Sequence, residues 1–541
     1  MIARQNCVAE WSYRSSKSYK DPFRDIEAWV LVTDPRGEQV KVPAFWAGDD
    51  VWRVRYCSSE VGVHTYKAVC SDSSDTGLHG KSGEINITAY SGDNILLKHG
   101  PLRKSENGTY LEHQDGKPFY WMGDTWWMGL TTRLDWPAGF HTLAFDRVKK
   151  GFSVIQIVAG LYPDMDPFDE RGANEGGFPW TRDFGTINPA YFDMADLKIS
   201  ALVDSGLVPC IVGCWGYFLD FAGEDVIARH WEYLVARYAA YPVVWCLAGE
   251  AVMPFYLNEN AREGKGKQEY ADRIRTGWTN IARQVKSYDS FKRPVTIHPT
   301  RNGHEMIDDP DLLDLDMLQT GHGSFLSLAP TVEQIRSAVA REPRLPVINS
   351  EVCYEGICGT SGPDVQRFLF WSCALSGTCG HTYGANGIWQ LNSRAQPYGP
   401  SPHGATWGDT PWEEAYQLPG SRQVGFGAEL LRRYRWWEFT SHQEWLEKHS
   451  TNDEPFAPFA AGISEEVRIF FFPILGNFGW GGFLVKEMEP GIRYHAFYFD
   501  PITGEEFDQG IAEADANGCW RSGKVWIFQD WVLVLEKSLD N

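Results

Sequence analysis

Short alternating runs of apolar and polar residues occur at both ends of the chain. Residues 28–33 and 62–69 place apolar side chains at about every second position, and residues 494–500 carry a similar pattern near the C-terminus. A period of two is typical of strands that bury one face against a second sheet. The pattern therefore predicts one β-sandwich over residues 1–95 and another over residues 455–541.

The central part of the chain differs, because apolar runs of strand length alternate there with longer helical patterns. Residues 189–206, for example, have helical periodicity and end on a glycine. Such alternation is typical of β/α units around a parallel sheet, and eight apolar runs match the strand count of a (β/α)8 barrel. The predicted fold class is therefore α/β, a (β/α)8 TIM barrel over residues 96–445 between the two β-sandwiches. The eight predicted strands are 119–123, 152–159, 208–213, 243–247, 294–297, 315–318, 346–349 and 379–383.

Charge and cysteine pattern argue against several classes of protein. The 541 residues include 50 Lys and Arg against 71 Asp and Glu, and the resulting net charge of −21 argues against nucleic acid as a partner. No apolar stretch approaches the roughly 20 residues of a membrane helix, so no membrane role is expected. The chain starts without a basic region followed by an apolar run, and its 11 cysteines form no CxxC pair. Both features favour a cytoplasmic protein with reduced thiols.

The sequence also lacks the motifs that bind common cofactors. No GxxxxGK[ST] or GxGxxG follows a predicted strand, so no nucleotide cofactor is expected. The acidic residues Asp164, Asp166, Asp169 and Glu170 lack the glycine-centred spacing of a calcium loop, and no metal is expected. Cys353 has no local signature of a catalytic thiol, which argues against a cysteine hydrolase.

Two glutamates follow predicted barrel strands, at the end of the barrel where active sites lie. Glu250 follows the fourth strand and Glu351 follows the seventh, so both carboxylates are expected at one barrel mouth. Cleavage of a glycosidic bond needs one protonated carboxyl to serve the leaving oxygen and one ionised carboxylate at the anomeric carbon. At a separation of about 5–5.5 Å, Glu351 would attack and Glu250 would act as acid and then base.

These residues and their surroundings resemble the apiosidase-like (β/α)8 glycoside hydrolases, which carry one β-sandwich before the barrel and one after it. The resemblance implies an acid/base at Glu250 and a nucleophile at Glu351. Two positions depart from the pattern: Gly249 stands where the wider clan usually has Asn, and Glu250 stands where apiosidase-like members often have Asp, so apiose is not assumed as the sugar. The similar segments are 121–127, 188–193, 241–250, 319–322, 346–351 and 499–504.

Further polar and aromatic residues at strand ends are candidates for contacts with sugar hydroxyls or sugar rings. Two long segments, 161–180 after the second strand and 390–412 after the eighth, are expected to wall the cleft and favour removal of terminal sugars. The candidate substrate-binding residues are Asp124, Trp126, Trp215, His298, His322, Tyr354, His381, Tyr383 and Trp389.

The predicted function is a retaining, exo-acting glycosidase that cleaves O-glycosidic bonds of imported oligosaccharides or glycosides, including pentofuranosides such as apiosides. Its partner is the carbohydrate substrate, and the flanking sandwiches are expected to buttress the barrel or to mediate self-association. Two alternatives stay open: a carbohydrate-binding protein without catalysis, which would have similar aromatic residues, and a transglycosylating or cyclising enzyme that uses the same glutamates.

Overall fold

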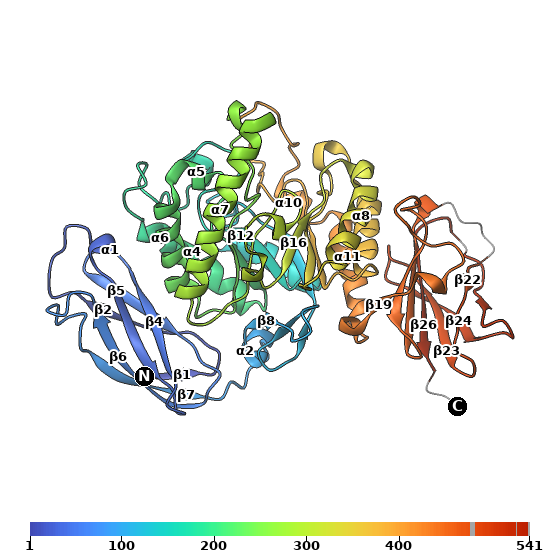
Figure 1. Ribbon diagram of the computed structural model, residues 1–541, viewed down its shortest axis with the longest axis horizontal. Helices are drawn as coiled ribbons and strands as arrows, with labels where there is room; N and C mark the ends of the chain where they lie inside the picture. Colours follow the sequence, from blue (N-terminus) through green and yellow to red (C-terminus); the bar gives the residue numbers. More distant parts are fainter. Residues whose placement is uncertain (477–481, 526, 539–541) are drawn as a thin grey trace.

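The computed structural model describes residues 1–476, 482–525 and 527–538. Three parts follow one another along the chain, and Figure 1 shows them from left to right: an N-terminal β-sandwich, a central barrel with its helices, and a C-terminal β-sandwich. None of the helices in the described part has the length and apolar character needed to cross a membrane.

The N-terminal sandwich is formed by seven strands in the order β1-β7-β6-β3-β4-β5-β2. The alternation in the sequence explains its core, since Val30 and Val32 of β3 and Ile85 and Ile87 of β7 are all buried, while their neighbours along each strand are more exposed. The strands are β1 (Ile2–Arg4), β2 (Ala9–Arg14), β3 (Ala28–Thr33), β4 (Gln39–Trp46), β5 (Val51–Tyr56), β6 (Gly62–Cys70) and β7 (Ser82–Thr88), and the short helices α1 (Pro22–Asp25) and α2 (Ile95–His99) lie before β3 and after β7.

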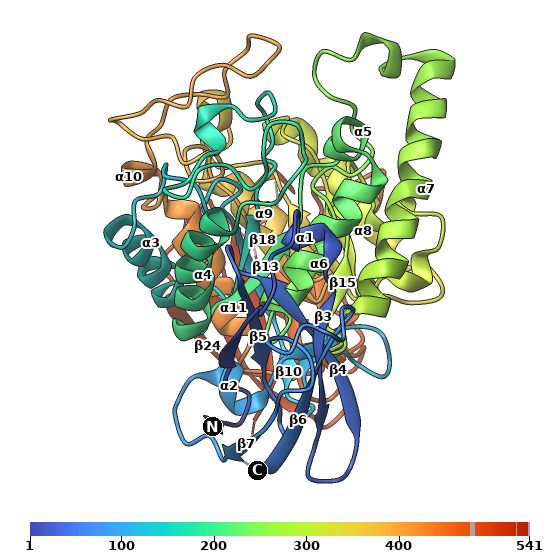
Figure 2. The ribbon, with the colours of Figure 1, turned by 90° about the vertical axis from the view of Figure 1, so that its left-hand side faces the viewer.

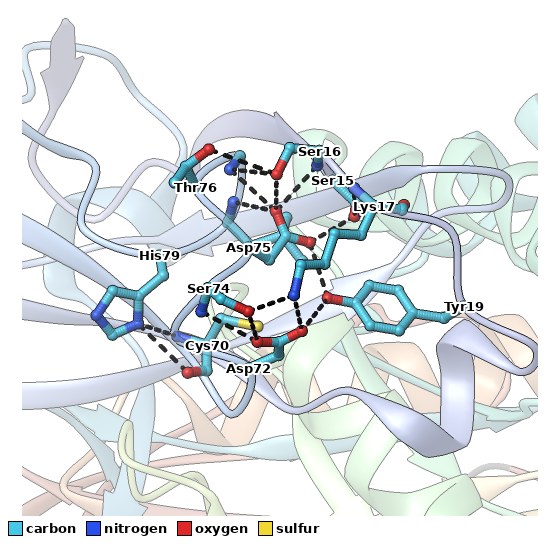
Figure 3. Close-up of polar contacts among 12 residues, drawn as sticks. Ser15, Ser16, Lys17, Tyr19, Cys70, Asp72, Ser74, Asp75, Thr76 and His79 are labelled. Atoms are coloured by element: carbon cyan, nitrogen blue, oxygen red, sulfur yellow. Dashed lines mark hydrogen bonds and ion pairs between the residues drawn. The ribbon is translucent and has the colours of Figure 1, made fainter.

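A buried carboxylate ties two loops of this sandwich together (Figure 3). Asp75 accepts hydrogen bonds from the backbone N–H and the hydroxyl of Ser16, both at 2.9 Å, and from the Tyr19 hydroxyl at 3.0 Å. Burial opposes ionisation of Asp75, but the bonds from Ser15 and Ser16 outweigh it and hold the pKa of Asp75 below its usual range. The cluster therefore has a structural role, in which the carboxylate of Asp75 is hydrogen-bonded by residues of the same sandwich.

The barrel contains eight parallel strands in the order β15-β14-β13-β12-β11-β18-β17-β16. Strand β11 pairs with both β12 and β18, so the sheet curves round on itself. The two edge strands are linked by the Thr296 hydroxyl, which donates to Leu315 O at 2.9 Å, and by the Asp314 N–H, which donates to Val295 O at 2.8 Å. The fold prediction is confirmed. The strands are β11 (Trp121–Thr125), β12 (Val154–Val158), β13 (Val208–Val212), β14 (Val244–Cys246), β15 (Val295–Thr296), β16 (Asp316–Gln319), β17 (Val347–Glu351) and β18 (Gly380–Tyr383).

Helices follow seven of the eight strands within the described barrel. The connection from β15 to β16 has only the 3-10 turns η3 (Gly303–Glu305) and η4 (Pro310–Leu312). The predicted helix 189–206 corresponds to α4, whose cap Asn188 accepts from the Ala190 N–H. The helices are α3 (Ala138–Lys149), α4 (Pro189–Asp204), α6 (Glu224–Tyr238), α7 (Gly264–Tyr288), α8 (Leu328–Val339), α9 (Pro363–Ala374) and α11 (Pro419–Leu431), with the shorter α5 (Phe218–Ala222) and α10 (Trp412–Ala415).

The first barrel strand lies two residues later than the sequence pattern indicates. The predicted strand 119–123 corresponds to β11, which runs from Trp121 to Thr125. Phe119 instead belongs to a three-stranded antiparallel sheet that precedes the barrel, because β10 pairs with β9. This small sheet consists of β8 (Leu102–Lys104), β9 (Leu111–His113) and β10 (Pro118–Phe119).

The C-terminal sandwich has a six-stranded sheet in the order β19-β20-β21-β26-β23-β24 and a two-stranded sheet of β22 and β25. Its first strand begins at Thr440, ahead of the predicted limit at 455, and the predicted span to 541 includes residues outside the described part. The strands are β19 (Thr440–Ser441), β20 (Phe459–Ile463), β21 (Val467–Phe472), β22 (Leu484–Val485), β23 (Arg493–Phe499), β24 (Glu506–Glu513), β25 (Trp520–Arg521) and β26 (Trp531–Lys537).

Buried ion pairs join both sandwiches to the barrel. Arg55 of β5 donates to Asp196 of α4 at 3.1 Å, and Arg237 of α6 donates to the same carboxylate at 2.8 Å. On the other side, Arg367 of α9 contacts Asp530 at 2.7 Å, with both side chains under 10% exposed. Removal of one partner would leave an uncompensated buried charge, which costs about 3–5 kcal/mol, so each sandwich depends on its contact with the barrel.

Candidate active site

The two predicted glutamates lie on one cavity at the C-terminal end of the barrel strands. Glu351 is the last residue of β17, and Glu250 lies four residues beyond the end of β14. Glu250 has a φ of +41°, a left-handed conformation that is strained for a residue with a side chain. Both side chains line a cavity of about 140 Å³. The cavity is small compared with typical drug-sized pockets.

Two histidines hold the carboxylate of Glu351. His322 Nε2 lies 2.9 Å from Glu351 Oε1, and His298 Nε2 lies 2.9 Å from Glu351 Oε2. Burial raises the pKa of Glu351, but its close contacts with His298 and His322 outweigh burial, so this pKa lies well below its ordinary value of 4.5. Glu351 is therefore an ionised carboxylate at neutral pH.

His322 is in turn kept protonated by its surroundings. Burial lowers the pKa of His322, but its contacts with Cys353 and Glu351 outweigh this effect and raise the pKa to about 10. The imidazole ring also stacks on Tyr354, with ring centroids 4.7 Å apart. His322 is thus a fixed cation beside the Glu351 carboxylate.

Glu250 experiences the opposite electrostatic environment. Its Oε1 accepts a hydrogen bond from Gln319 Nε2 at 2.9 Å, and its Oε2 accepts one from Trp215 Nε1 at 3.3 Å. Burial raises the pKa of Glu250, the negative charge of Glu351 raises it further, and the bond from Gln319 only partly opposes the rise. Two carboxyls whose surroundings push their pKa values apart are the usual basis of an acid and a base in one site.

Aromatic side chains form one wall of the cavity. Tyr354 lies between His322 and Trp389, and its ring is stacked on that of Trp389 at 6.0 Å with an angle of 17° between the ring planes. The Tyr354 hydroxyl accepts a hydrogen bond from Trp127 Nε1 at 3.0 Å, and Trp215 contacts the Trp127 ring edge to face. Such rigid rings suit the apolar face of a sugar.

Loops close the remaining sides. Asp164 comes from the predicted wall segment 161–180, Trp407 comes from the other wall segment 390–412, and Tyr256 comes from the chain between Glu250 and α7. Tyr256 contacts His403 of the 390–412 segment with ring centroids 5.5 Å apart, so two of these loops touch. Figure 2 shows the 390–412 segment, in orange, and the start of α7 rising at the same end of the barrel.

Two candidates near the first strand lie away from this cavity. Asp124 is fully buried inside β11, where its carboxylate accepts from Arg147 Nε at 2.5 Å and from Trp126 Nε1 at 2.7 Å. Trp126 is also fully buried and packs edge to face against Phe140. Asp124 and Trp126 are therefore hydrogen-bonded to each other, and neither is among the residues that line the cavity.

Two candidates on the eighth strand are also absent from the cavity lining. Tyr383 donates from its hydroxyl to Glu355 Oε2 at 2.6 Å, and Glu355 also accepts from the Gly420 N–H of α11 at 3.0 Å. His381 is fully buried beside the ring of Phe370, and burial lowers its pKa to about 3, so its ring is neutral. The structure therefore brings together Trp215, His298, His322, Tyr354 and Trp389 around the two glutamates, and it places Asp124, Trp126, His381 and Tyr383 elsewhere.

Sequence reasoning missed several residues at the site. Gln319 lies in the segment 319–322 that supports the family resemblance, and its position at the end of β16 is a usable signal. The other missed lining residues come from loops without periodicity, and they are Pro163, Asp164, Met253, Tyr256, Ile357 and Trp407. Within the described residues, no group of three or more His, Cys, Asp or Glu side chains is arranged to hold a metal ion.

A (β/α)8 barrel with an ionised glutamate at the end of β17 and a raised-pKa glutamate after β14 has the arrangement of a glycosidase. The family model for the apiosidase-like catalytic domain matches residues 105–438, which is more than half of the chain, so the chain belongs to the apiosidase-like family. This membership confirms the predicted glycoside hydrolase class. A domain of unknown function (DUF5060) matches residues 4–71.

Solved structures agree with this fold. A protein described as a glycoside hydrolase is 20% identical with a TM-score of 0.67, over 83% of this chain and all of its own. A glycoside hydrolase family 5 protein from Bacteroides vulgatus is 21% identical with a TM-score of 0.66, over 83% of this chain and 96% of its own. A second Bacteroides vulgatus protein, provisionally described as a glycoside hydrolase, is 16% identical with a TM-score of 0.70 over 99% of this chain and all of its own. No curated protein matches the sequence.

Proposed function

We propose that the chain is a retaining, exo-acting O-glycosidase in which Glu351 is the nucleophile and Glu250 is the acid/base. The observation that carries this proposal is the opposite shift of the two carboxyls on one cavity, since Glu351 is held ionised between two histidines and Glu250 is pushed toward its protonated form. Retaining and inverting hydrolases both begin their cycle with these two states. The choice of a retaining mechanism is supported by the resemblance to the apiosidase-like family, which implies a nucleophile at Glu351.

In the proposed first step, Glu351 attacks the anomeric carbon while Glu250 gives its proton to the leaving oxygen. The products are a glycosyl ester on Glu351 and a free aglycone. Formation of the ester removes the negative charge from Glu351, which lowers the pKa of Glu250 and prepares Glu250 to act as a base. Glu250 then takes a proton from water, the water oxygen attacks the anomeric carbon, and Glu351 is released as a carboxylate.

The loops support exo-action on a terminal sugar. A small cavity whose walls touch through Tyr256 and His403 suits the end of a chain better than its middle. The family name makes pentofuranosides such as apiosides a reasonable substrate class. For the cytoplasmic location, support comes from the 11 cysteines, which all lie in the described part of the chain and are all free thiols.

The test is hydrolysis of a panel of 4-nitrophenyl glycosides, including pentofuranosides, by wild type, Glu250→Gln and Glu351→Gln, with the product anomer followed by NMR. Glu259→Gln is the matched control, because this exposed glutamate lies nine residues after Glu250 and does not line the cavity. We expect turnover of at least one glycoside with retained configuration, a loss of at least ~10³-fold in Glu351→Gln, and unchanged turnover in Glu259→Gln.

Other outcomes distinguish the alternatives. Turnover that survives both cavity substitutions would contradict the proposed site. Inversion of the anomer would exclude Glu351 as nucleophile. Sugar binding without any turnover would favour a carbohydrate-binding protein, and a transferred or cyclised product would favour transglycosylation by the same glutamates.

A further inference from the structure

One carboxylate on the cavity has no role in the proposed chemistry. Asp164 lies in the segment after β12, is 2% exposed and lines the cavity together with both glutamates. Neither of its carboxylate oxygens has a hydrogen-bond partner of good geometry within the described residues. A buried acceptor without a partner costs free energy, and at a binding site the missing partner is often the ligand.

The surroundings of Asp164 fix its position without satisfying it. Its backbone has a φ of +58°, and its carbonyl oxygen lies 3.4 Å from the Tyr398 hydroxyl. The indole N–H of Trp407 is directed to Ser401 Oγ at 2.9 Å. Burial raises the pKa of Asp164, and Ser401 and Trp407 only partly oppose the rise. The carboxyl is therefore buried at the cavity, and neither of its oxygens has a hydrogen bond of good geometry within the described residues.

A second unsatisfied group lies on the same cavity. The indole N–H of Trp389 is buried and has no acceptor within the described residues, and its ring packs edge to face on Tyr398 at 5.7 Å. Tyr398 thus contacts both Asp164 and Trp389. Asp164 lacks hydrogen-bond donors, and the Trp389 N–H lacks an acceptor. A ligand with adjacent hydroxyl groups can supply both, because each hydroxyl can donate its hydrogen and accept through its oxygen.

The cavity has no lysine or arginine among its lining residues, whereas Asp164, Glu250 and Glu351 contribute carboxyl groups. A uronic acid would place a further carboxylate beside Asp164 in a buried site, and His322, the protonated side chain of the lining, is already paired with Glu351. The site is therefore matched to an uncharged sugar.

We propose that Asp164 is a specificity-determining residue, whose two carboxylate oxygens accept hydrogen bonds from neighbouring hydroxyl groups of a neutral terminal sugar and thereby select it over deoxy sugars and uronic acids. This inference rests on the proposed glycosidase function. Trp389 assists by donating its indole N–H to a hydroxyl oxygen of the same sugar. A site built to bind hydroxyl groups rejects analogues that lack them strongly, because its own polar groups are then left unpaired.

The test compares wild type with Asp164→Asn and Asp164→Ala, and Asp166→Asn is the matched control because Asp166 is an exposed aspartate in the same segment. The substrates are the 4-nitrophenyl glycoside that wild type hydrolyses best, its monodeoxy analogues and the corresponding uronide. We expect at least one monodeoxy analogue to lose about 10- to 100-fold in kcat/KM with wild type, as for hydrogen bonds to a charged group. Asp164→Ala should lose a similar factor on the parent glycoside and less than about 3-fold on that analogue.

The uronide supplies an independent comparison. Wild type should disfavour it at least ~10-fold against the neutral parent, and Asp164→Asn should narrow this gap by removing the repulsion. Equal losses by Asp164→Ala on parent and deoxy substrates, or a wild-type preference for the uronide, would overturn the proposal. Failure of the glycosidase function itself is recognised separately, by turnover that is insensitive to Glu250→Gln and Glu351→Gln.

If wild type hydrolyses no member of the panel, the role of Asp164 is tested by the binding of free neutral monosaccharides. Binding is measured through the fluorescence of the cavity tryptophans. Binding weakened at least ~10-fold in Asp164→Ala and unchanged in Asp166→Asn would support the role of Asp164. Binding that is equal in all variants, or absent for every neutral sugar, would overturn it.

Discussion

His322 Nε2 lies 2.9 Å from Glu351 Oε1, and this contact joins a histidine held protonated to a glutamate held ionised. His298 approaches the other oxygen of the same carboxylate at 2.9 Å. Both oxygens of Glu351 are therefore positioned by imidazole rings from neighbouring strand ends. A nucleophile fixed in this way is oriented before the substrate arrives, which is a large part of what an active site contributes.

The first prediction concerns His322→Gln. The glutamine keeps a hydrogen-bond donor but removes the positive charge, so the pKa of Glu351 should rise toward its ordinary value. We expect the acidic limb of the kcat/KM against pH profile to move to higher pH, and kcat/KM to fall about 10- to 100-fold. His141→Gln, at an exposed histidine of α3, should leave the profile unchanged. An acidic limb that stays in place would contradict this assignment.

The second prediction concerns stability against pH. His322 has a folded-state pKa of about 10, above its ordinary 6.5, so its contribution is complete below pH 6.5 and declines as pH rises toward 10. The pKa of Glu351 is lowered, so its contribution is complete above pH 4.5 and is lost as pH falls. Urea unfolding should therefore give the largest difference between wild type and His322→Gln between pH 4.5 and 6.5. A difference that is as large at pH 9 would argue against a protonated His322.

The third prediction separates the two glutamates by leaving group. Glu250 is assigned to protonate the leaving oxygen, so Glu250→Gln should slow glycosides of alcohols by ~10²-fold or more. In glycosides of strongly acidic phenols the leaving oxygen needs little protonation. The rate of their first step should therefore fall much less in Glu250→Gln. Glu351→Gln should lose activity on both kinds of glycoside, because attack on carbon is needed for each. Equal losses in the two variants on activated phenols would contradict the assignment.

The barrel was predictable because each of its strands is a short apolar run followed, in most cases, by an amphipathic helix. The exact ends of the strands were less predictable. Because site residues were sought just after strand ends, some residues inside strands were wrongly included. Asp124 was placed after the first strand, but β11 extends to Thr125, so Asp124 lies inside the strand and pairs with Arg147. His381 and Tyr383 likewise lie within β18, where their side chains are buried in the barrel.

Residues beyond strand ends were predicted better than residues on long loops. His298 and His322 lie two and three residues after the ends of β15 and β16, and both reach the carboxylate of Glu351. Asp164 and Trp407 belong to loops with no hydrophobic period, so their place depends on contacts between distant segments, such as that between Tyr256 and His403. Local pattern carries no information on such contacts.

The fourth prediction concerns Gly249, which directly precedes Glu250. A Cβ atom at this position would lie 2.2 Å from the Trp215 ring, so the glycine is needed for the indole to reach Glu250. We expect Gly249→Ala to displace Trp215 and to lower kcat/KM about tenfold or more. Trp215→Phe is the comparison, because it removes the N–H donor and keeps an aromatic ring. If Gly249→Ala is as active as wild type, Trp215 does not depend on this close approach.

The last prediction tests whether the thiol of Cys353 takes part in the chemistry. Burial raises its pKa, but contact with His322 outweighs burial and the pKa is lowered, which is the property of a reactive cysteine. However, the side chain is fully buried and is not among those that line the cavity. We therefore expect Cys353→Ala to keep kcat/KM within about tenfold of wild type, as expected of a neighbour that acts only through His322. The exposed Cys358→Ala is the control. If Cys353→Ala were as inactive as Glu351→Gln, the thiol would replace the glutamate as the nucleophile, and His322 would then be its activating cation.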